Sequence, residues 1–120
     1  MTTQLQRQFQ VEEIGDVTVV RWDEQPHWPD SGDQLFKLVD EAGRRKLVLN
    51  FGNAESLSST VLAKLMMLNK KLQTVGGVLI LCNLSPHVRE VFEVTRVNEF
   101  FGFHPGEAEA LQALAAGNVK

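Results

Sequence analysis

Several features that mark specialised protein classes are missing from this sequence. Cys82 is the only cysteine, which excludes an internal disulfide framework and fits a reducing compartment. No apolar run approaches the roughly 18 residues of a membrane span, and residues 1–10 lack the apolar stretch of a signal peptide. We therefore expect a cytoplasmic protein that does not associate with a membrane and in which Cys82 is an inert core residue.

Catalytic and cofactor-binding motifs are also missing. The sequence has no GxSxG, GxxxxGK[ST] or GxGxxG motif, and His27, His87 and His104 lack the spacing of metal ligands. The 12 basic residues against 15 acidic ones give a net charge of −3, which does not favour nucleic acid. We expect a protein that is not an enzyme, needs no metal or cofactor, and binds another protein. Binding of a small ligand or nucleotide is a weaker alternative, because no glycine-rich or lysine-bearing loop is present.

Short apolar segments alternate with helical patterns along the chain. A chain of 120 residues that is 43% hydrophobic predicts a single domain over residues 1–120. The order β-β-α-β-α-β-α-β-α predicts an α/β fold with a mixed sheet and parallel central strands. The predicted strands are Phe9–Ile14, Val17–Trp22, Lys46–Phe51, Val78–Cys82 and about Phe100–Phe103. The predicted helices are about Leu35–Gly43, Ser59–Val75, Pro86–Thr95 and Gly106–Ala116, and Asp23–Gly32 is predicted to be a loop.

The segment from Ser59 to Val75 has the clearest helical periodicity. Gly76-Gly77 ends it, as expected for a helix C-terminus, and the adjacent Met66 and Met67 are expected to be core and flank. Ser85 and Pro86 mark the start of the next helix, as its N-cap and first residue. The inward stripe of the first helix is expected to contain Val61, Leu65, Leu68, Leu72 and Val75, flanked by Leu62 and Met66. That of the second is expected to contain Val88, Val91, Phe92 and Thr95.

Three hydroxyl residues, Ser58, Ser59 and Thr60, lie where the segment after a strand becomes a helix. Serine and threonine commonly cap the free N–H groups of a first helical turn. Only one of the three can be the cap, so at least one hydroxyl remains on a turn beyond the end of a strand. Open α/β sheets often carry functional groups at this edge. On the residues alone, both a capping and a functional role stay open.

Several motifs in succession resemble the STAS domain, the family of bacterial anti-sigma factor antagonists. They are the Ser-Ser step into a helix, the Gly-Gly stop, a strand ending in LCNLSP and a helix reading VREVFEVT, within about Arg44 to Ala116. The resemblance implies a STAS-like mixed sheet of four to five strands with helices packed on one side. It also implies partner switching that regulates transcription. In that scheme a switch-type partner, both anti-sigma factor and serine kinase, phosphorylates one serine at the start of the central helix.

The family motif, Asp-Ser-Ser or Asp-Ser-Thr followed by Gly-Leu, aligns with residues 58–62. The alignment implies that Ser59 is the phosphorylated residue, with Ser58 and Thr60 as secondary candidates. Ser58 stands where the family has its acidic residue, which removes a carboxylate that could orient the acceptor hydroxyl. Val61 replaces the glycine and adds bulk where a partner's backbone would approach. The implied partner-binding residues are Ser56, Leu57, Ser58, Ser59, Thr60, Val61 and Leu62.

A second class of function fits the same resemblance. A STAS scaffold, or a subunit of a larger signalling assembly, would use Ser58 and Ser59 only as helix caps and would not be phosphorylated. The family's Gly-Glu-Leu-Asp turn after the second strand is not matched at Glu24–His27. In both cases we expect a monomer or weak dimer.

Overall fold

A computed structural model describes most of the chain. The described residues are 9–22, 36–37, 39–40, 43–52, 54, 57–96 and 101–115. The predicted loop Asp23–Gly32 lies outside this part of the chain. The predicted helix of about Leu35–Gly43 is described at residues 36–37 and 39–40, which are helical.

Five strands and three helices lie within the described ranges. Their order agrees with the sequence pattern, and no predicted boundary within these ranges moves by more than two residues. They are β1 (Phe9–Ile14), β2 (Val17–Trp22), β3 (Lys46–Asn50), α2 (Ser59–Thr74), β4 (Val78–Cys82), α3 (Pro86–Val94), β5 (Gly102–His104) and α4 (Glu107–Ala115).

The strands form one mixed sheet in the order β1-β2-β3-β4-β5. β1 and β2 are antiparallel and are joined by a two-residue turn, in which Gly15 has a φ of +63°. Glycine is favoured at the first position of such turns because it adopts positive φ without strain. The remaining neighbours pair in parallel, from Val17 beside Lys46 onward. The predicted α/β fold with a mixed sheet is confirmed.

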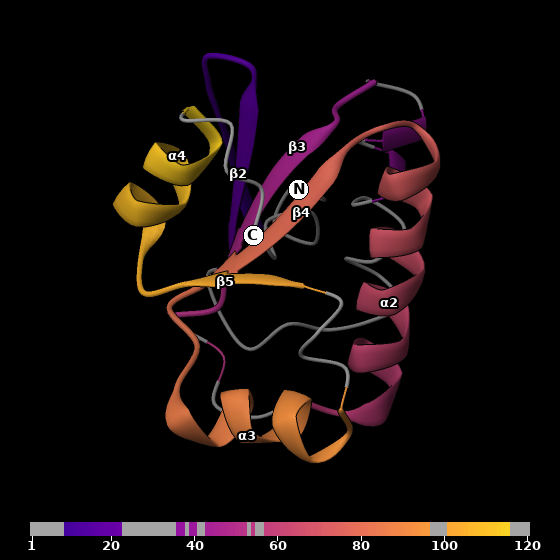
Figure 1. The fold of residues 1–120 in the computed structure, drawn as a ribbon, viewed down its shortest axis with the longest axis vertical. Helices are drawn as coiled ribbons and strands as arrows, with labels where there is room; N and C mark the ends of the chain where they lie inside the picture. The colour runs from indigo at the N-terminus through magenta and orange to yellow at the C-terminus, as the bar shows by residue number, and fades with distance from the viewer. Residues whose placement is uncertain are drawn as a thin grey trace, which may run out of the picture.

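Helices cover both faces of the sheet. Side chains alternate along a strand, and β3 and β4 are apolar at successive positions, so each face has apolar surface to bury. α2 and α3 pack on one face, through Leu65, Leu72 and Phe92. α4 packs on the other, through Ala110 and Leu114, and Figure 1 shows it across the sheet from α2. The expectation that the helices lie on one side holds for α2 and α3 and is wrong for α4.

The buried stripe of α2 differs from the predicted stripe at three positions. Met66 is 38% exposed and Val75 is 39% exposed, whereas Asn69 is only 7% exposed. Val75 is the C-cap residue. Its backbone is no longer helical, so its side chain does not follow the stripe. Met67, 55% exposed, is also outside the core. Val61, Leu62, Leu65, Leu68 and Leu72 are buried as predicted.

α3 is amphipathic as expected, with Val88 and Phe92 buried and Val91 half-buried. Thr95 was predicted to face inward, but it is exposed. It is the C-cap residue of α3, and its hydroxyl donates to the Val91 carbonyl oxygen at 2.7 Å. A hydroxyl that bonds to a carbonyl of the last turn serves the helix end rather than the core.

The predicted N-cap Ser85 is confirmed, and of the three hydroxyl residues left open at the start of α2 it is Ser58 that is the N-cap. The Oγ atoms of Ser58 and Ser85 each accept a hydrogen bond of 3.2 Å from the backbone N–H three residues on, at Val61 and Val88. α2 ends where predicted, because Gly76 has a φ of +75° and the Gly77 N–H bonds back to the Leu72 carbonyl oxygen at 2.7 Å. These local interactions fix where α2 and α3 start and where α2 ends.

A side-chain network ties α4 to the sheet. Arg21 of β2 donates through Nε and Nη2 to the two carboxylate oxygens of Glu107, at 2.6 and 2.8 Å. Asn50, the last residue of β3, donates from Nδ2 to Glu107 Oε2 at 2.5 Å. Arg21 Nη2 also lies 2.8 Å from Glu12 Oε1 on β1. The bonds from Arg21, and a further bond from Asn50, lower the pKa of Glu107.

We expect Ser58→Ala to lower the free energy of unfolding by about 1 kcal/mol, because it removes the acceptor of the Val61 N–H. Ser59→Ala is the matched control one residue on, and its hydroxyl bonds to none of the described residues. It should change stability by less than about 0.5 kcal/mol. Chemical denaturation measures both. Equal losses in the two variants would contradict the assignment of Ser58 as the cap.

Glu107→Gln should lower stability at neutral pH by about 1 to 3 kcal/mol, since it weakens hydrogen bonds to a charged carboxylate. Folding lowers the pKa of Glu107, so its contribution is complete above the unfolded value of about 4.3 and is lost as the pH falls through the folded value. Urea denaturation as a function of pH should show the wild-type advantage shrinking in acid. Glu109→Gln, on the exposed side of the same helix, is the control. A gap that is equal at about pH 7 and about pH 3 would refute this ionic contribution.

Candidate functional site

The segment between β3 and α2 is held to the core at two points. Phe51 and Ala54 are only 1% and 3% exposed. The Phe51 N–H bonds to the Cys82 carbonyl oxygen at 3.0 Å, which extends the pairing with β4, and the Ala54 N–H bonds to the Phe51 carbonyl oxygen at 3.0 Å. The backbone N–H of Gly52 bonds to Asn50 Oδ1 at 2.8 Å. The described residues directly after β3 are therefore held against the sheet.

The three hydroxyls at the start of α2 have different surroundings. Ser58, Ser59 and Thr60 are all exposed. The Ser58 hydroxyl is occupied, because it caps the helix through the Val61 N–H. Within the described part of the chain, the hydroxyls of Ser59 and Thr60 make no hydrogen bond. The surplus hydroxyl expected from the sequence is therefore present on the surface of the first turn.

The expected partner-binding segment contains both surface and core residues. Val61 and Leu62 are 5% and 8% exposed and belong to the core under α2. The expectation that the Val61 side chain adds bulk toward a partner is therefore wrong, because that bulk points inward. Leu57 is half-buried against the same core, and Ser56 lies outside the described residues.

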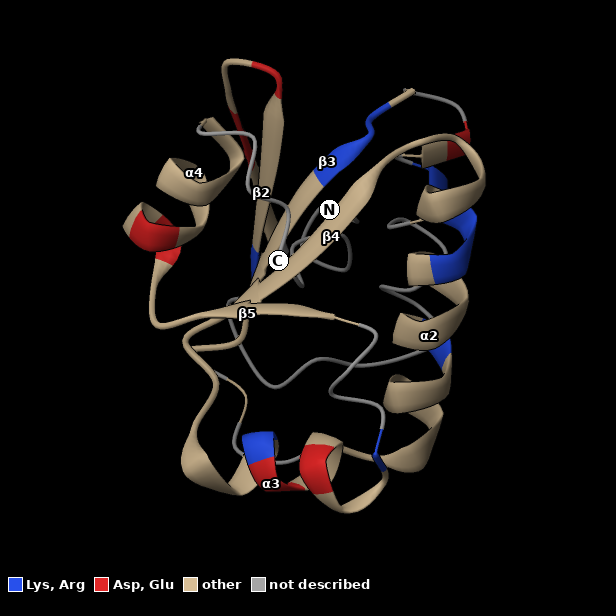
Figure 2. Cartoon of the chain, viewed as in Figure 1, with Lys and Arg blue, Asp and Glu red and all other residues tan. Residues whose placement is uncertain are grey.

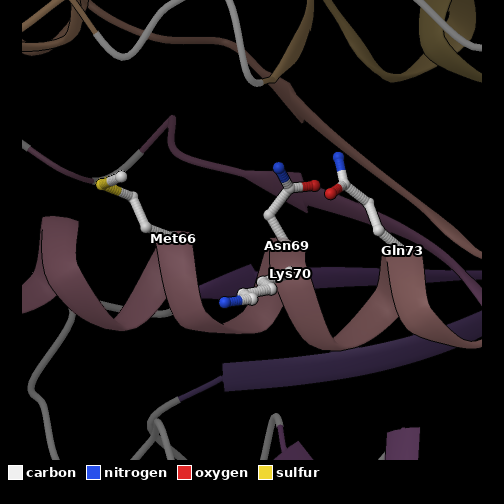
Figure 3. A pocket seen from close by; sticks show the side chains of 4 residues that line it. All are labelled: Met66, Asn69, Lys70 and Gln73. Atoms are coloured by element: carbon white, nitrogen blue, oxygen red, sulfur yellow. The ribbon is translucent and has the colours of Figure 1, made fainter.

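The outward face of α2 continues the surface that begins at Ser59. Ala63, Met67 and Lys70 follow it at helical spacing, and all three are exposed. A groove of about 250 Å³ lies along one flank of the same helix. Figure 3 shows Asn69 and Gln73 extending together on that flank. The lining residues are Met66, Asn69, Lys70 and Gln73.

The charged side chains of α2 are all positive. The helix carries Lys64, Lys70 and Lys71 and no acidic residue, and Figure 2 shows acidic residues on α3 and α4. Lys71 Nζ lies 3.1 Å from Asp40 Oδ1. No carboxylate in the first turn offsets the positive end of the helix dipole. The turn that carries the Ser59 hydroxyl is thus suited electrostatically to an anion.

Groups for catalysis are not gathered at this site. Within the described ranges, no three His, Cys, Asp or Glu side chains are placed to hold a metal ion. Cys82 is fully buried, and its burial raises the pKa of the thiol to about 12, so the thiol stays protonated and unreactive. No described helix combines the length and apolar character needed to cross a membrane. The arrangement provides an exposed hydroxyl on a rigid turn.

Sequence reasoning missed the role of Asn50 and Gly52. An asparagine whose side chain accepts from the backbone N–H two residues on forms an Asx turn, and asparagine before a glycine at a strand end is a signal for it. The sequence offered this signal in Asn50-Phe51-Gly52. The second partner of Asn50, Glu107, is 57 residues away in sequence and could not be found from local pattern.

The chain was compared with known proteins. The family model of the STAS domain matches residues 8–110. BtrV of Bordetella bronchiseptica, a protein named for a proposed role as an anti-sigma factor antagonist, is 44% identical over 62 residues. That alignment covers 52% of this chain and 53% of BtrV, so the chain matches about half the length of this relative.

Solved structures share the fold at low sequence identity. A STAS domain protein of Planctomyces limnophilus superposes with a TM-score of 0.79 at 24% identity, over 89% of this chain and 97% of that one. The cell fate determinant SpoIIAA of Bacillus, in its phosphorylated form, gives 0.69 at 22% identity, over 88% and 98%. The five-stranded mixed sheet and the match over residues 8–110 together show that this chain belongs to the STAS domain family.

Proposed function

We propose that this protein is an anti-sigma factor antagonist that acts in the cytoplasm through partner switching. Its docking surface is the start of α2, and its partner is an anti-sigma factor of the switch-kinase type that phosphorylates Ser59. One observation carries the proposal. Ser58 serves as the helix cap, so the neighbouring Ser59 hydroxyl is exposed and has no structural task among the described residues.

The relatives support this assignment by their names. BtrV, with 44% identity over the matched half, is named for the same role. SpoIIAA shares the fold and has been solved in a phosphorylated and an unphosphorylated form. A STAS fold that persists in both forms supports a switch that changes the surface and leaves the fold intact.

The chemistry at Ser59 is a simple transfer. Its Oγ attacks the γ-phosphorus of ATP held by the kinase, the bond from that phosphorus to the ADP oxygen breaks, and the hydroxyl proton passes to a base of the kinase. The product carries about −1.5 to −2 charges near neutral pH. At the start of α2 this charge is favoured by roughly 0.3 to 1 kcal/mol, because it faces the positive end of the helix. The free protein therefore stays folded.

Phosphorylation of Ser59 is favourable in the free protein but unfavourable in the complex with the partner. A partner that covers the turn removes water from the phosphoryl group, and an unpaired ion in a dry interface costs several kcal/mol. A cost of about 1.4 kcal/mol already weakens binding tenfold. Phosphorylation of Ser59 thus releases the partner. Val61 and Leu62 keep the turn rigid from below, since both are anchored in the core.

A second candidate is a STAS subunit of a larger signalling assembly that is not phosphorylated. One observation favours it, which is that Ser58 replaces the acidic residue of the family motif, so no carboxylate lies in the first turn. A chain from the stressosome, described as a signal integration and transduction hub, shares the fold with a TM-score of 0.71 at 15% identity. In this alternative the outward face of α2 would contact neighbouring subunits.

We expect Ser59→Asp to weaken binding of the partner kinase at least about tenfold, because it places a charge in the interface. Ser59→Ala should keep most of the affinity, since it removes the hydroxyl and adds no charge. Both variants should resist phosphorylation, measured as intact mass after incubation with the kinase and ATP. The partner is first isolated by pull-down from the native cell, and affinities are then measured with the purified protein.

The matched control is Thr74→Asp, which adds the same charge at the exposed far end of α2. It should bind within about twofold of wild type, a difference of under about 0.5 kcal/mol. Equal binding by Ser59→Asp and Ser59→Ala would refute the switch and favour the assembly subunit. Addition of a phosphoryl group to Ser59→Ala would refute Ser59 as the acceptor and place it at another hydroxyl, with Ser58 and Thr60 adjacent in the chain.

A further inference from the structure

The side chain of Asn50 makes hydrogen bonds at both ends of its amide group. Its Oδ1 accepts from the Gly52 N–H at 2.8 Å, and its Nδ2 donates to Glu107 Oε2 at 2.5 Å. Gly52 belongs to the segment that leads to the start of α2, residues 57–60, which we call the docking turn. Glu107 is the first residue of α4 on the other face of the sheet. One side chain thus connects two parts of the fold that pack in separate core clusters.

The carboxylate of Glu107 decides which way the Asn50 amide faces. A carboxylate accepts hydrogen bonds and cannot donate them, so it pairs with the NH₂ end of an amide. Arg21 holds both Glu107 oxygens through a bidentate pair at 2.6 and 2.8 Å. The Glu107 side chain is only 20% exposed, so water competes weakly for these bonds. The oxygen of Asn50 is therefore directed to the Gly52 N–H.

This orientation fixes the direction in which the chain leaves β3. An Asx turn closes a tight loop between a side-chain oxygen and the N–H two residues on. Gly52 has little space, because a Cβ there would lie 3.1 Å from Asn50 Oδ1 and 3.8 Å from the Cβ of Asn83. Phe51 and Ala54, on either side of Gly52, are both buried, so a shift at Gly52 would disturb the backbone between two core residues of the segment that continues to α2.

We propose that Asn50 is a positioning residue for partner docking. Its bond to the Gly52 N–H sets the position of the docking turn, and Glu107 and Arg21 orient the Asn50 side chain. The inference rests on the proposed function, because it assigns a task to Asn50 in presenting Ser59. It also makes the start of α4 a point from which the docking turn can be disturbed across the sheet.

The variant Asn50→Asp tests this proposal, because it replaces only the side-chain NH₂ group with an oxygen. The new carboxylate can still accept from the Gly52 N–H, but the variant loses the donor and brings a second negative charge against Glu107. We expect it to remain folded and to lose partner affinity at least about tenfold. Glu107→Gln alone should weaken binding less than Asn50→Asp does, since its amide oxygen can still accept from Asn50 but its amide no longer enforces one orientation. The double variant N50D/E107Q removes the repulsion between the two carboxylates, but an amide NH₂ at position 107 that donates to the carboxylate at position 50 would face the Arg21 Nε donor, which lies 2.6 Å from the same Glu107 oxygen, so binding should not recover.

A second readout needs no partner. Hydrogen exchange at the Gly52 amide of the free protein, followed by NMR, should accelerate at least about fivefold in Asn50→Asp and should stay fast in the double variant. Gly52→Ala, which presses on Asn50 Oδ1 without touching Glu107, should weaken binding in the same direction. Leu111→Ala is the control for stability alone, because it loosens α4 packing away from Asn50.

The outcomes separate this inference from the proposed function. Unchanged Gly52 exchange and wild-type affinity in folded Asn50→Asp would overturn the inference while partner docking stands. Equal loss of binding in Leu111→Ala and Asn50→Asp at equal loss of stability would reduce Asn50 to a purely structural role and would also overturn it. Failure of the wild type to bind any switch-type kinase would refute the proposed function, and the Gly52 exchange would still decide whether Asn50 orders the turn.

Discussion

A helix leaves the N–H groups of its first turn without partners inside the helix, and something outside must satisfy them. In α2 the Ser58 hydroxyl takes on this task for Val61. That one bond frees Ser59 for another use and fixes the first turn on which Ser59 lies. Since the first turn contains no acidic residue, its positive end remains available to an anion. The same geometry that starts the helix therefore suits it to carry a phosphoryl group.

The sheet determines where this turn can be presented. β3 and β4 are apolar on both faces, so they need helices on both, and α4 supplies the second layer. Placing α4 there brings Glu107 beside Asn50 and Arg21 at the edge where β3 ends. The burial of apolar surface thus positions a polar network, and that network bonds to the Gly52 N–H directly after β3.

Local signals in the sequence predicted most of the elements correctly. Ser85 as a cap, Pro86 as a first helical residue and Gly76 at a helix end each act through near neighbours, so pattern was sufficient. Pattern alone left open which of Ser58, Ser59 and Thr60 caps α2, and the structure identifies Ser58. Two failures were local, because Val75 and Thr95 are C-cap residues rather than members of the inward stripes. The other failures depended on distant contacts. The apolar side of α4 indicated that it packs, but not on which face, and the 57-residue separation of Asn50 and Glu107 hid their pairing. Met66 and Met67 were assigned to the core and its flank because methionine is usually apolar filling, yet the buried side of α2 was completed by Asn69.

The central claim is that the first turn of α2 is the surface that meets the partner. It is tested most directly by titrating isotopically labelled wild-type protein with the purified partner kinase, without nucleotide, and mapping the perturbed backbone amides by NMR. We predict that the strongest perturbations fall on residues 57–60 and continue along the outward side of α2 to Met67 and Lys70. Perturbations confined to the β1–β2 hairpin or to α4, with residues 57–60 unchanged at saturation, would contradict the account.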